Sequence, residues 1–478
     1  MSSDAGPGLT KVVATLGPAC DGLETLSAMI RAGMTVARLN LSHGSHAEHA
    51  ARIARVREAA RLCGLPVAVM FDTRGPEVRT APLGSAPVEL AEGDGFLLHV
   101  DGRPTTAAGT SVTHVRLPAE VEPGARVLVD DGRIELQVLA VDAEGVRCEV
   151  VRGGELSGRK SVHVRGARLS LDPLGAGDRA DLRFAVEQGT DYLAASFVRS
   201  AEDVKRIREV LRSHGAEVPI VAKIEDREGV ERLEEVVDAA DGTMVARGDL
   251  GVALPVEEVP LAQKRIIRTT VAAGKPVVTA TQMLDSMERN QQPTRAEATD
   301  VANAIFDGSS AVMLSGETAR GRYPLEAVRT MVRLARSAES ALAEYGDLQR
   351  LELGAPGSVT EAVARATVHL AHQLRAAAIL TVTETGFTSR AVSKCRPRCP
   401  ILAITPDPGV VRRLCLNWGV TPLQVGPGAA DGDEARIAFG LERARALGRV
   451  RSGDLVVTTA GVARAVGTTS LIRVVQVP

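Results

Sequence analysis

Charged and hydroxyl-bearing side chains recur at the ends of short apolar runs in this sequence. The run TVARLNLS carries Arg38, Asn40 and Ser42 at alternate positions, which share one face of a strand. A later run, IVAKIE, places Lys223 and Glu225 on one face in the same way. Polar groups are costly in a buried strand unless they serve a site. We therefore expect both runs to deliver their polar residues to a functional site.

Three further apolar runs end in the same manner. Their terminal residues are Asp72, Thr73 and Arg74; Arg247, Gly248 and Asp249; and Thr279 and Thr281. Five clusters at matched positions favour one shared site over the alternative, a structural layer of inward-facing ion pairs.

The chemistry of these clusters is coherent. Glu225 and Asp249 offer hard oxygen ligands, which suit magnesium or manganese. Oxygen donors for a second cation are Asn40, Ser42, Asp72 and Thr73. Arg38 and Lys223 supply positive charge for a phosphate or a developing oxyanion. Two cation sites beside two basic side chains indicate phosphoryl transfer.

Eight apolar runs alternate with stretches of helical period, which predicts an α/β fold built on a (β/α)8 TIM barrel. A doubly wound open sheet is the alternative, and the number of runs favours the barrel. The carboxyl ends of barrel strands meet at one mouth, where the polar clusters would converge. The predicted strands lie within 11–17, 35–42, 67–73, 192–198, 220–225, 242–249, 276–282 and 311–317, and the clearest helices are 201–213, 228–239, 257–272 and 294–306.

The alternation of apolar runs and helical stretches stops after the third run, where Gly, Pro and Asp accompany alternating β patterns. We read this stretch as a small inserted β-barrel domain at the mouth, suited to act as a lid. A softer boundary near LELGAPGS precedes a separate α/β pattern. The predicted domains are a catalytic barrel over 1–74 and 164–350, a β lid domain over 75–163 and a C-terminal α/β regulatory and interface domain over 356–478.

Composition narrows the function further. Of the 478 residues, 57 are Lys or Arg and 59 are Asp or Glu, so no broad binding of nucleic acid or membrane is expected. Aromatic residues are too few for a surface that stacks bases. The six scattered cysteines form no CxxC motif and predict reduced thiols in a cytoplasmic protein. No secretory leader or membrane-spanning run is predicted.

Long segments resemble the pyruvate kinase family. They include ARLNLSHG, DTRGPEVRT, AKIEDREG, MVARGDLGVALP, ATQMLDSM and PTRAEATDVANAIFDG, and the resemblance runs from about residue 10 to the end. It implies a glycolytic phosphotransferase that converts phosphoenolpyruvate and ADP into pyruvate and ATP, and that forms a homotetramer. Two rival hypotheses are another barrel enzyme that handles phosphoenolpyruvate or an enolate, and a catalytically idle paralogue that senses a metabolite.

The resemblance also implies roles for single residues at the barrel mouth. Arg38 and Lys223 would contact the transferring phosphoryl group, and Lys223 would steady the enolate. Thr281 would lie near the substrate and the proton relay. The backbone amides of Gly248 and Asp249 would receive the substrate carboxylate.

Cation and nucleotide sites follow from the same resemblance. Magnesium or manganese would be held by Glu225 and Asp249, while Glu77 implies dependence on potassium. Arg79 would reach the nucleotide, and Asp131 would approach it from the lid. Potassium would be held by four residues: Asn40, Ser42, Asp72 and Thr73.

An effector loop is implied at Thr383, Thr385, Gly386 and Thr388. A carboxylate at Glu384 should repel a bisphosphate, so we expect weak or absent activation by fructose 1,6-bisphosphate. AMP, a sugar monophosphate or no effector remain the options. Arg74 departs from the lysine usual in its motif, and VHVRG at 162–166 departs from the usual lid hinge. His43, His46 and His49 have helical spacing, and we favour a solvated helix start there over a zinc site.

Overall fold

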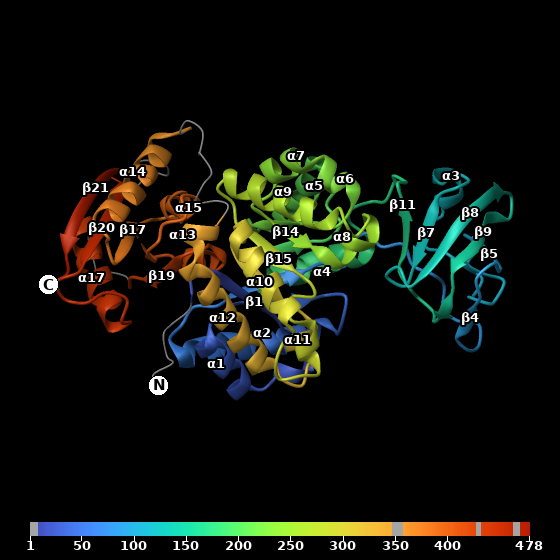
Figure 1. The fold of residues 1–478 in the computed structure, drawn as a ribbon, viewed down its shortest axis with the longest axis horizontal. Coiled ribbons are helices and arrows are strands. Elements are labelled where there is room, and N and C mark those ends of the chain that lie inside the picture. The colour runs from blue at the N-terminus through green and yellow to red at the C-terminus, as the bar shows by residue number, and fades with distance from the viewer. Residues whose placement is uncertain (1–7, 347–356, 427–431, 462–468) are drawn as a thin grey trace.

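The computed structural model describes residues 8–346, 357–426, 432–461 and 469–478, and these residues form three parts arranged along one axis (Figure 1). The barrel lies in the middle, between an inserted β part and a C-terminal α/β part. The predicted boundary near residue 351 lies outside the described residues. No helix in the described ranges is long and apolar enough to cross a membrane.

Eight parallel strands close the central barrel in the order β1-β16-β15-β14-β13-β12-β3-β2. Each predicted run forms one strand, so the barrel prediction is confirmed. The runs are almost wholly apolar because helices cover the outer face of each strand and side chains fill the inner face. The strands are β1 (Lys11–Thr15), β2 (Met34–Asn40), β3 (Ala68–Asp72), β12 (Tyr192–Ala195), β13 (Ile220–Ile224), β14 (Gly242–Ala246), β15 (Val277–Ala280) and β16 (Ala311–Leu314).

Helices follow the barrel strands and surround them. Capping boxes start two of these helices, with Ser45 and Glu48 at α2 and with Thr294 and Glu297 at α10. The helices are α1 (Leu23–Ala32), α2 (His46–Cys63), α4 (Ala176–Glu187), α5 (Ala201–Ser213), α6 (Arg227–Glu231), α7 (Leu233–Ala239), α8 (Arg247–Ala253), α9 (Val259–Ala272), α10 (Arg295–Asp307), α11 (Gly316–Ala319), α12 (Pro324–Ser340) and α13 (Leu342–Tyr345), with 3-10 turns η1 (Pro18–Cys20) and η2 (Asp285–Glu288).

Two local expectations differ from the structure. The helix predicted over 228–239 is divided into α6 and α7 at Arg232. The run predicted to end at residue 249 stops at Ala246, because α8 begins at once with Arg247. The residues Arg247, Gly248 and Asp249 therefore lie in the first turn of a helix and not at the end of a strand.

The histidine prediction fails at His49. We expected a solvated helix start, but His49 is only 2% exposed. Although His46 lies on the same helix face and is 40% exposed, His49 lies one turn further into α2, where its ring packs edge-on against the buried Phe71. Its Nε2 lies 2.8 Å from the carbonyl oxygen of His43. His46 instead lies at the start of α2 and stacks on Phe184.

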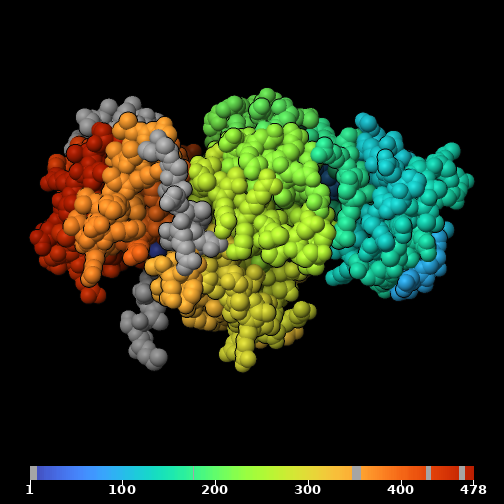
Figure 2. Space-filling view, turned by 45° about the horizontal axis from the view of Figure 1, so that its top comes forward, coloured from blue at the N-terminus to red at the C-terminus, as the bar shows by residue number. Residues whose placement is uncertain are grey.

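The inserted part follows β3 and forms a separate lobe beside the barrel (Figure 2). Its six-stranded sheet has the order β11-β7-β8-β9-β5-β6, and a two-stranded sheet pairs β10 with β4. Its own apolar core includes Leu98, Leu117 and Leu136. The elements are β4 (Val88–Leu90), β5 (Gly95–His99), β6 (Gly109–Ser111), α3 (Leu117–Glu120), β7 (Arg126–Val129), β8 (Ile134–Asp142), β9 (Gly145–Arg152), β10 (Gly154–Leu156) and β11 (Val162–Arg165).

The C-terminal part is a five-stranded sheet of order β19-β18-β17-β20-β21, parallel except between β20 and β21. Its η4 turn reaches the barrel, where Cys415 and Leu416 join an apolar cluster to which all eight barrel strands contribute. The elements are α14 (Val359–Gln373), β17 (Ala378–Val382), α15 (Phe387–Lys394), β18 (Ile401–Thr405), α16 (Pro408–Arg413), η4 (Leu414–Leu416), β19 (Val420–Gln424), α17 (Asp433–Ala446), β20 (Leu455–Gly461) and β21 (Thr469–Gln476).

Candidate active site

A buried network of ion pairs occupies the carboxyl ends of β2, β3 and β13. Arg38 Nε donates to Asp72 Oδ2 at 2.7 Å, and its Nη1 donates to Thr15 Oγ1 at 2.8 Å. Lys223 Nζ lies 3.0 Å from Asp72 Oδ1 and 2.9 Å from Glu225 Oε1. The structure therefore brings together four of the residues that the sequence placed at separate strand ends.

Burial and charge act in opposite directions on the protonation of this network. Burial works against ionisation of Asp72, but Arg38 and Lys223 outweigh it and hold the pKa of that carboxyl below its usual range. Burial also opposes the charge of Lys223, yet the Asp72 and Glu225 carboxylates raise the pKa of its ammonium above the usual range. At neutral pH the network therefore contains an ionised Asp72 and a permanently charged Lys223.

The Glu225 carboxylate is buried beside a second carboxylate, so its negative charge is only partly balanced. Burial raises the pKa of its carboxyl to about 8, against the pull of Lys223, and the nearby Asp249 raises it further. Its Oε2 accepts a hydrogen bond from the Phe197 amide at 2.6 Å. Its Oε1 is buried and accepts no hydrogen bond, although it lies within ion-pair distance of Lys223. A buried carboxylate oxygen that a single ammonium approaches without a well-aligned hydrogen bond, beside a second carboxylate, fits a divalent cation.

The part of the chain that the structure describes brings no three His, Cys, Asp or Glu side chains together as a metal site. Glu225 and Asp249 are a pair of carboxylates, and Asp249 is half-buried in the first turn of α8. Mg²⁺ commonly keeps several water ligands and takes only one or two carboxylates from the protein, with further oxygens from substrate phosphates. The two carboxylates are therefore sufficient for such a site.

Oxygen donors for the second predicted cation lie at or just beyond the carboxyl ends of the adjoining strands β2 and β3. Asn40 and Asp72 are partners in the strand register. Thr73 is buried, and its Oγ1 accepts from the Ser196 amide at 3.1 Å. The Asn40 Oδ1 accepts from the Ser42 amide at 3.0 Å. Carboxylate, amide and hydroxyl oxygens suit a hard cation such as potassium, so the donor chemistry fits.

Thr281 follows β15 in a left-handed backbone conformation with a φ of 74°. A β-branched residue rarely adopts this conformation. A Cβ placed on Gly248 would lie 2.9 Å from the Thr281 Cγ2, so only glycine allows this approach. The structure therefore packs Thr281 directly onto Gly248 in the first turn of α8.

Arg79 and Asp131 lie at the border of the inserted part, and both are exposed. Arg79 pairs with Glu77 and donates from Nη1 to the Arg159 carbonyl at 3.0 Å. Asp131 has a φ of 54° and accepts from Ser161 Oγ at 2.7 Å. Neither residue contacts the Lys223 network in the described structure, so their predicted roles depend on a bound nucleotide.

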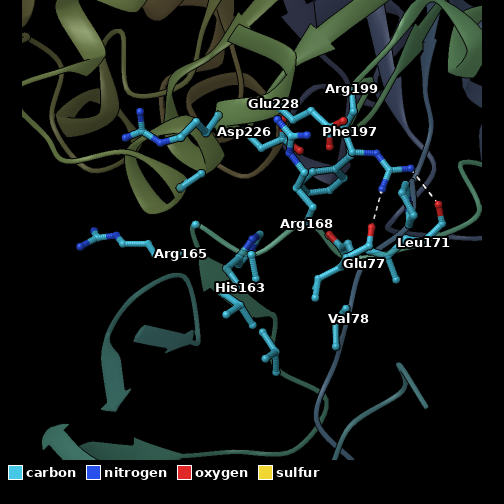
Figure 3. Close-up of a pocket in the computed structure, with 18 of the residues that line it drawn as sticks. Glu77, Val78, His163, Arg165, Arg168, Leu171, Phe197, Arg199, Asp226 and Glu228 are labelled. Atoms are coloured by element: carbon cyan, nitrogen blue, oxygen red, sulfur yellow. Dashed lines mark hydrogen bonds between the residues drawn. The ribbon is translucent and has the colours of Figure 1, made fainter. Parts of the chain in front are cut away.

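A cavity of about 290 Å³ separates the inserted part from the barrel. Glu77 lines it from the connection to the inserted part and His163 lines it from β11, while Phe197 lines it from the barrel (Figure 3). Arg199 donates to the carbonyl of Leu171 at 2.8 Å and so ties the returning connection to the barrel. The cavity adjoins the ion-pair network through Phe197, whose amide binds Glu225.

The predicted effector loop joins β17 to α15. Thr383 Oγ1 accepts from the Gly386 amide at 2.9 Å, and Gly386 has a φ of 81°. The Thr388 hydroxyl lies 2.6 Å from that of Thr469. Thr383 and Thr388 are buried, whereas Thr385 is exposed. Two of the three hydroxyls are thus engaged within the loop and its neighbour.

Glu384 is paired with Arg436, whose Nη1 lies 2.7 Å from its Oε1. The side chain of Glu384 is 40% exposed. Since Arg436 offsets the negative charge, the argument that Glu384 repels a bisphosphate is weaker than the sequence alone suggested.

Arg74, which replaces the usual lysine, does not face the ion-pair network. Its Nε donates to Asp181 Oδ2 at 3.0 Å, and the other oxygen of Asp181 lies 2.6 Å from His46 Nε2. The substitution therefore ties the loop after β3 to α4.

Sequence reasoning missed two residues that support the site. Ser196 Oγ lies 2.7 Å from Lys223 Nζ and donates to the Thr73 carbonyl at 2.7 Å. Phe197 presents its amide to Glu225 from a left-handed conformation with a φ of 52°. A serine at the end of the fourth apolar run was a usable signal, because it matches the polar ends of the other runs.

This fold and this network, with two basic side chains and several carboxylates at the barrel mouth, point to a (β/α)8-barrel enzyme of the phosphotransferase class. A model of the pyruvate kinase barrel domain matches residues 8–328, and a model of the pyruvate kinase alpha/beta domain matches 361–475. The chain belongs to the pyruvate kinase family.

Curated relatives agree with this assignment. The pyruvate kinase of Geobacillus stearothermophilus is 48% identical over 469 residues, which cover 97% of this chain and 80% of the relative. Those of Bacillus licheniformis and Staphylococcus aureus strain MRSA252 are 45% and 44% identical with the same coverage. The activity of this family is the transfer of the phosphoryl group of phosphoenolpyruvate to ADP, which gives pyruvate and ATP, and this chain carries it.

Proposed function

We propose that phosphoryl transfer takes place beside Arg38, Lys223, Glu225 and Asp249 at the barrel mouth. The observation that carries this proposal is the buried Lys223 ammonium, held between two carboxylates at 2.9 Å and 3.0 Å. A buried cation in a cleft with perturbed pKa values is typical of a catalytic site.

Charge neutralisation is the first task in moving a phosphoryl group between two anions. Arg38 and Lys223 supply two positive charges, and Asp72 fixes both side chains through its two oxygens. Because the neighbouring carboxylates raise the pKa of Lys223, this residue stays an ammonium. Lys223 therefore stabilises negative charge on the phosphoryl group and the enolate, and it is a poor proton donor.

Substrate orientation comes from the first turn of α8. The amides of Gly248 and Asp249 belong to a helix N-terminus, where backbone donors lack partners within the helix. These amides receive the substrate carboxylate. Thr281, packed on Gly248, then lies beside the enolate and takes part in proton delivery to carbon.

The cation sites complete the charge balance. Glu225 and Asp249 hold magnesium or manganese, which when bound neutralises phosphate charge and orients the oxygens of both substrates. Potassium is held by oxygen donors at the ends of β2 and β3, and Glu77 marks potassium dependence. The donor residues are Asn40, Ser42, Asp72 and Thr73.

The inserted part acts as a lid that excludes water from the transfer step. Arg79 and Asp131 contact the nucleotide when the lid closes. The domains on which this proposal rests are the catalytic barrel (1–74 and 164–350), the lid (75–163) and the regulatory and interface domain (356–478).

A cytoplasmic homotetramer is the proposed assembly. All six cysteines are free thiols, in accord with a reducing compartment. The edge strand β21 exposes Leu471 and Val474, which suits burial against another subunit. An effector would bind at Thr383, Thr385, Gly386 and Thr388. We still expect little response to fructose 1,6-bisphosphate, because a carboxylate remains in the loop even though Arg436 pairs with it. Light scattering, together with assays with and without this sugar, tests these points.

The cation assignment is tested with a pair of glutamate variants. Glu225→Gln should weaken Mn²⁺ binding, measured by electron paramagnetic resonance, by about tenfold or more because an anionic ligand is lost. Glu228→Gln is the matched control, since that carboxylate pairs with Arg232 instead. Equal Mn²⁺ affinity in Glu225→Gln and wild type would contradict the assignment. Turnover without potassium would contradict the role given to Glu77.

A further inference from the structure

Two consecutive residues at the barrel mouth have left-handed backbones. Thr281 and Gln282 follow β15 with φ values of 74° and 54°. Such conformations persist only where the surroundings enforce them, and they gather at functional sites. Something must therefore hold this turn in place.

The guanidinium of Arg247 is the group that holds the turn. Its Nη2 donates to the Thr281 carbonyl at 2.8 Å and to the Gln282 carbonyl at 3.3 Å, and its Nε donates to the Ala280 carbonyl at 3.3 Å. Its Nη1 donates to Asp300 Oδ1 at 2.7 Å, and only 13% of the Arg247 side chain is exposed. One planar cation thus binds three successive carbonyls and is itself fixed by a carboxylate on α10.

Arg247 is also the first residue of α8. The next two residues carry the amides assigned to the substrate carboxylate, and Gly248 lies against the Thr281 side chain. The same residue therefore links the helix turn that binds substrate to the strained turn that presents Thr281. A lysine has a single point of charge and cannot bind three carbonyls and a carboxylate in one plane.

We propose that Arg247 is a positioning residue, which locks the left-handed turn so that the Thr281 hydroxyl faces the reacting carbon of the substrate. This inference rests on the proposed role of Thr281 in proton delivery. Arg247 itself does not touch substrate and acts through the geometry of its neighbour.

A double-mutant cycle tests the inference in the full chain. Arg247→Lys and Thr281→Val should each lower kcat by about 100-fold, since a displacement near 1 Å has that effect. The KM for phosphoenolpyruvate should change by less than about threefold. If Arg247 acts through Thr281, the double variant should be no slower than the slower single variant by more than about twofold.

Two further measurements separate positioning from a general structural role. Exchange of the methyl protons of pyruvate with deuterated water, followed by nuclear magnetic resonance, isolates proton transfer at carbon and should slow in both single variants. Mn²⁺ affinity and the unfolding midpoint should stay at wild-type values. Arg320→Lys is the matched control, because its exposed guanidinium hydrogen-bonds to the Glu288 carboxylate and to no main-chain carbonyl among the described residues, and it should leave kcat unchanged.

The outcomes are distinct. Multiplied effects, near 10⁴-fold in the double variant, would show that Arg247 acts independently of Thr281 and would overturn the inference. Wild-type kcat in Arg247→Lys with a slow Thr281→Val would overturn the inference alone. Wild-type kcat in Thr281→Val would overturn the proposed role of Thr281, on which the inference depends.

Discussion

Replacing Lys223 with methionine removes one charge at nearly constant volume. Its Nζ makes contacts of 3.0, 2.7 and 2.9 Å with Asp72, Ser196 and Glu225. Loss of one preorganised donor in a site sheltered from water raises the barrier by about 3–4 kcal/mol, which is about 10²–10³ in rate. Glu225 also loses the ion pair with Lys223, which opposes the effect of burial, so the pKa of its carboxyl rises further and the carboxylate becomes less available to a divalent cation. Together these effects predict a fall in kcat/KM of at least about a thousandfold.

The assay couples pyruvate formation from phosphoenolpyruvate and ADP to a dehydrogenase, with magnesium and potassium present. Lys11→Met is the matched control, because Lys11 is also a buried lysine, but its Nζ donates to the Val420 carbonyl at the opposite end of the barrel. That variant should retain most of the wild-type kcat. A Lys223→Met enzyme with more than about a tenth of wild-type kcat/KM would refute the reasoning from charge.

Three further outcomes follow from the packing and the buried charges. Gly248→Ala should lower kcat by about tenfold or more in the same assay, because the new Cβ would lie 2.9 Å from Thr281 Cγ2; unchanged kcat would deny that the contact matters. Gly440→Ala places a Cβ against Ile404 and should lower the free energy of unfolding by about 1–3 kcal/mol in urea melts. An unchanged free energy of unfolding would contradict this and show that α17 shifts to make room. Burial lowers the pKa of Lys11 to about 8 from its usual 10.5, so between these values the unfolded chain binds a proton that the folded chain does not. The free energy of unfolding of the wild type should therefore rise by roughly 3 kcal/mol relative to that of Lys11→Met as the pH rises through this window. Curves of unfolding free energy against pH that run parallel for the two proteins would refute the lowered pKa of Lys11.

The barrel could be predicted from sequence because each buried parallel strand is a compact apolar run with a fixed place in the β/α rhythm. Polar residues such as Lys223 and Glu225 stand out in such runs, so the core of the site was predictable as well. The contacts among them were not, since Arg38, Asp72 and Lys223 lie far apart in the chain and meet only when the barrel closes.

Residues whose contribution lies in the backbone escaped prediction. Phe197 serves the site through its amide, and Arg247 binds main-chain carbonyls, so their side-chain types gave little sign of either role. His49 was misjudged because helical spacing does not reveal which face of α2 points inward. The position of Arg247 was also missed, because the sequence did not show that α8 begins directly after β14.

The η4 turn has a consequence for modularity. Cys415 and Leu416 complete the apolar filling of the barrel, and the Tyr192 hydroxyl of β12 donates to the Arg413 carbonyl at 2.6 Å. A barrel cut away from the C-terminal part would expose this filling to water and leave the buried Tyr192 hydroxyl without its acceptor. The barrel and the C-terminal part are therefore poor candidates for exchange between unrelated proteins. A shift of the η4 turn would also displace side chains inside the barrel, because the two pack in one apolar cluster.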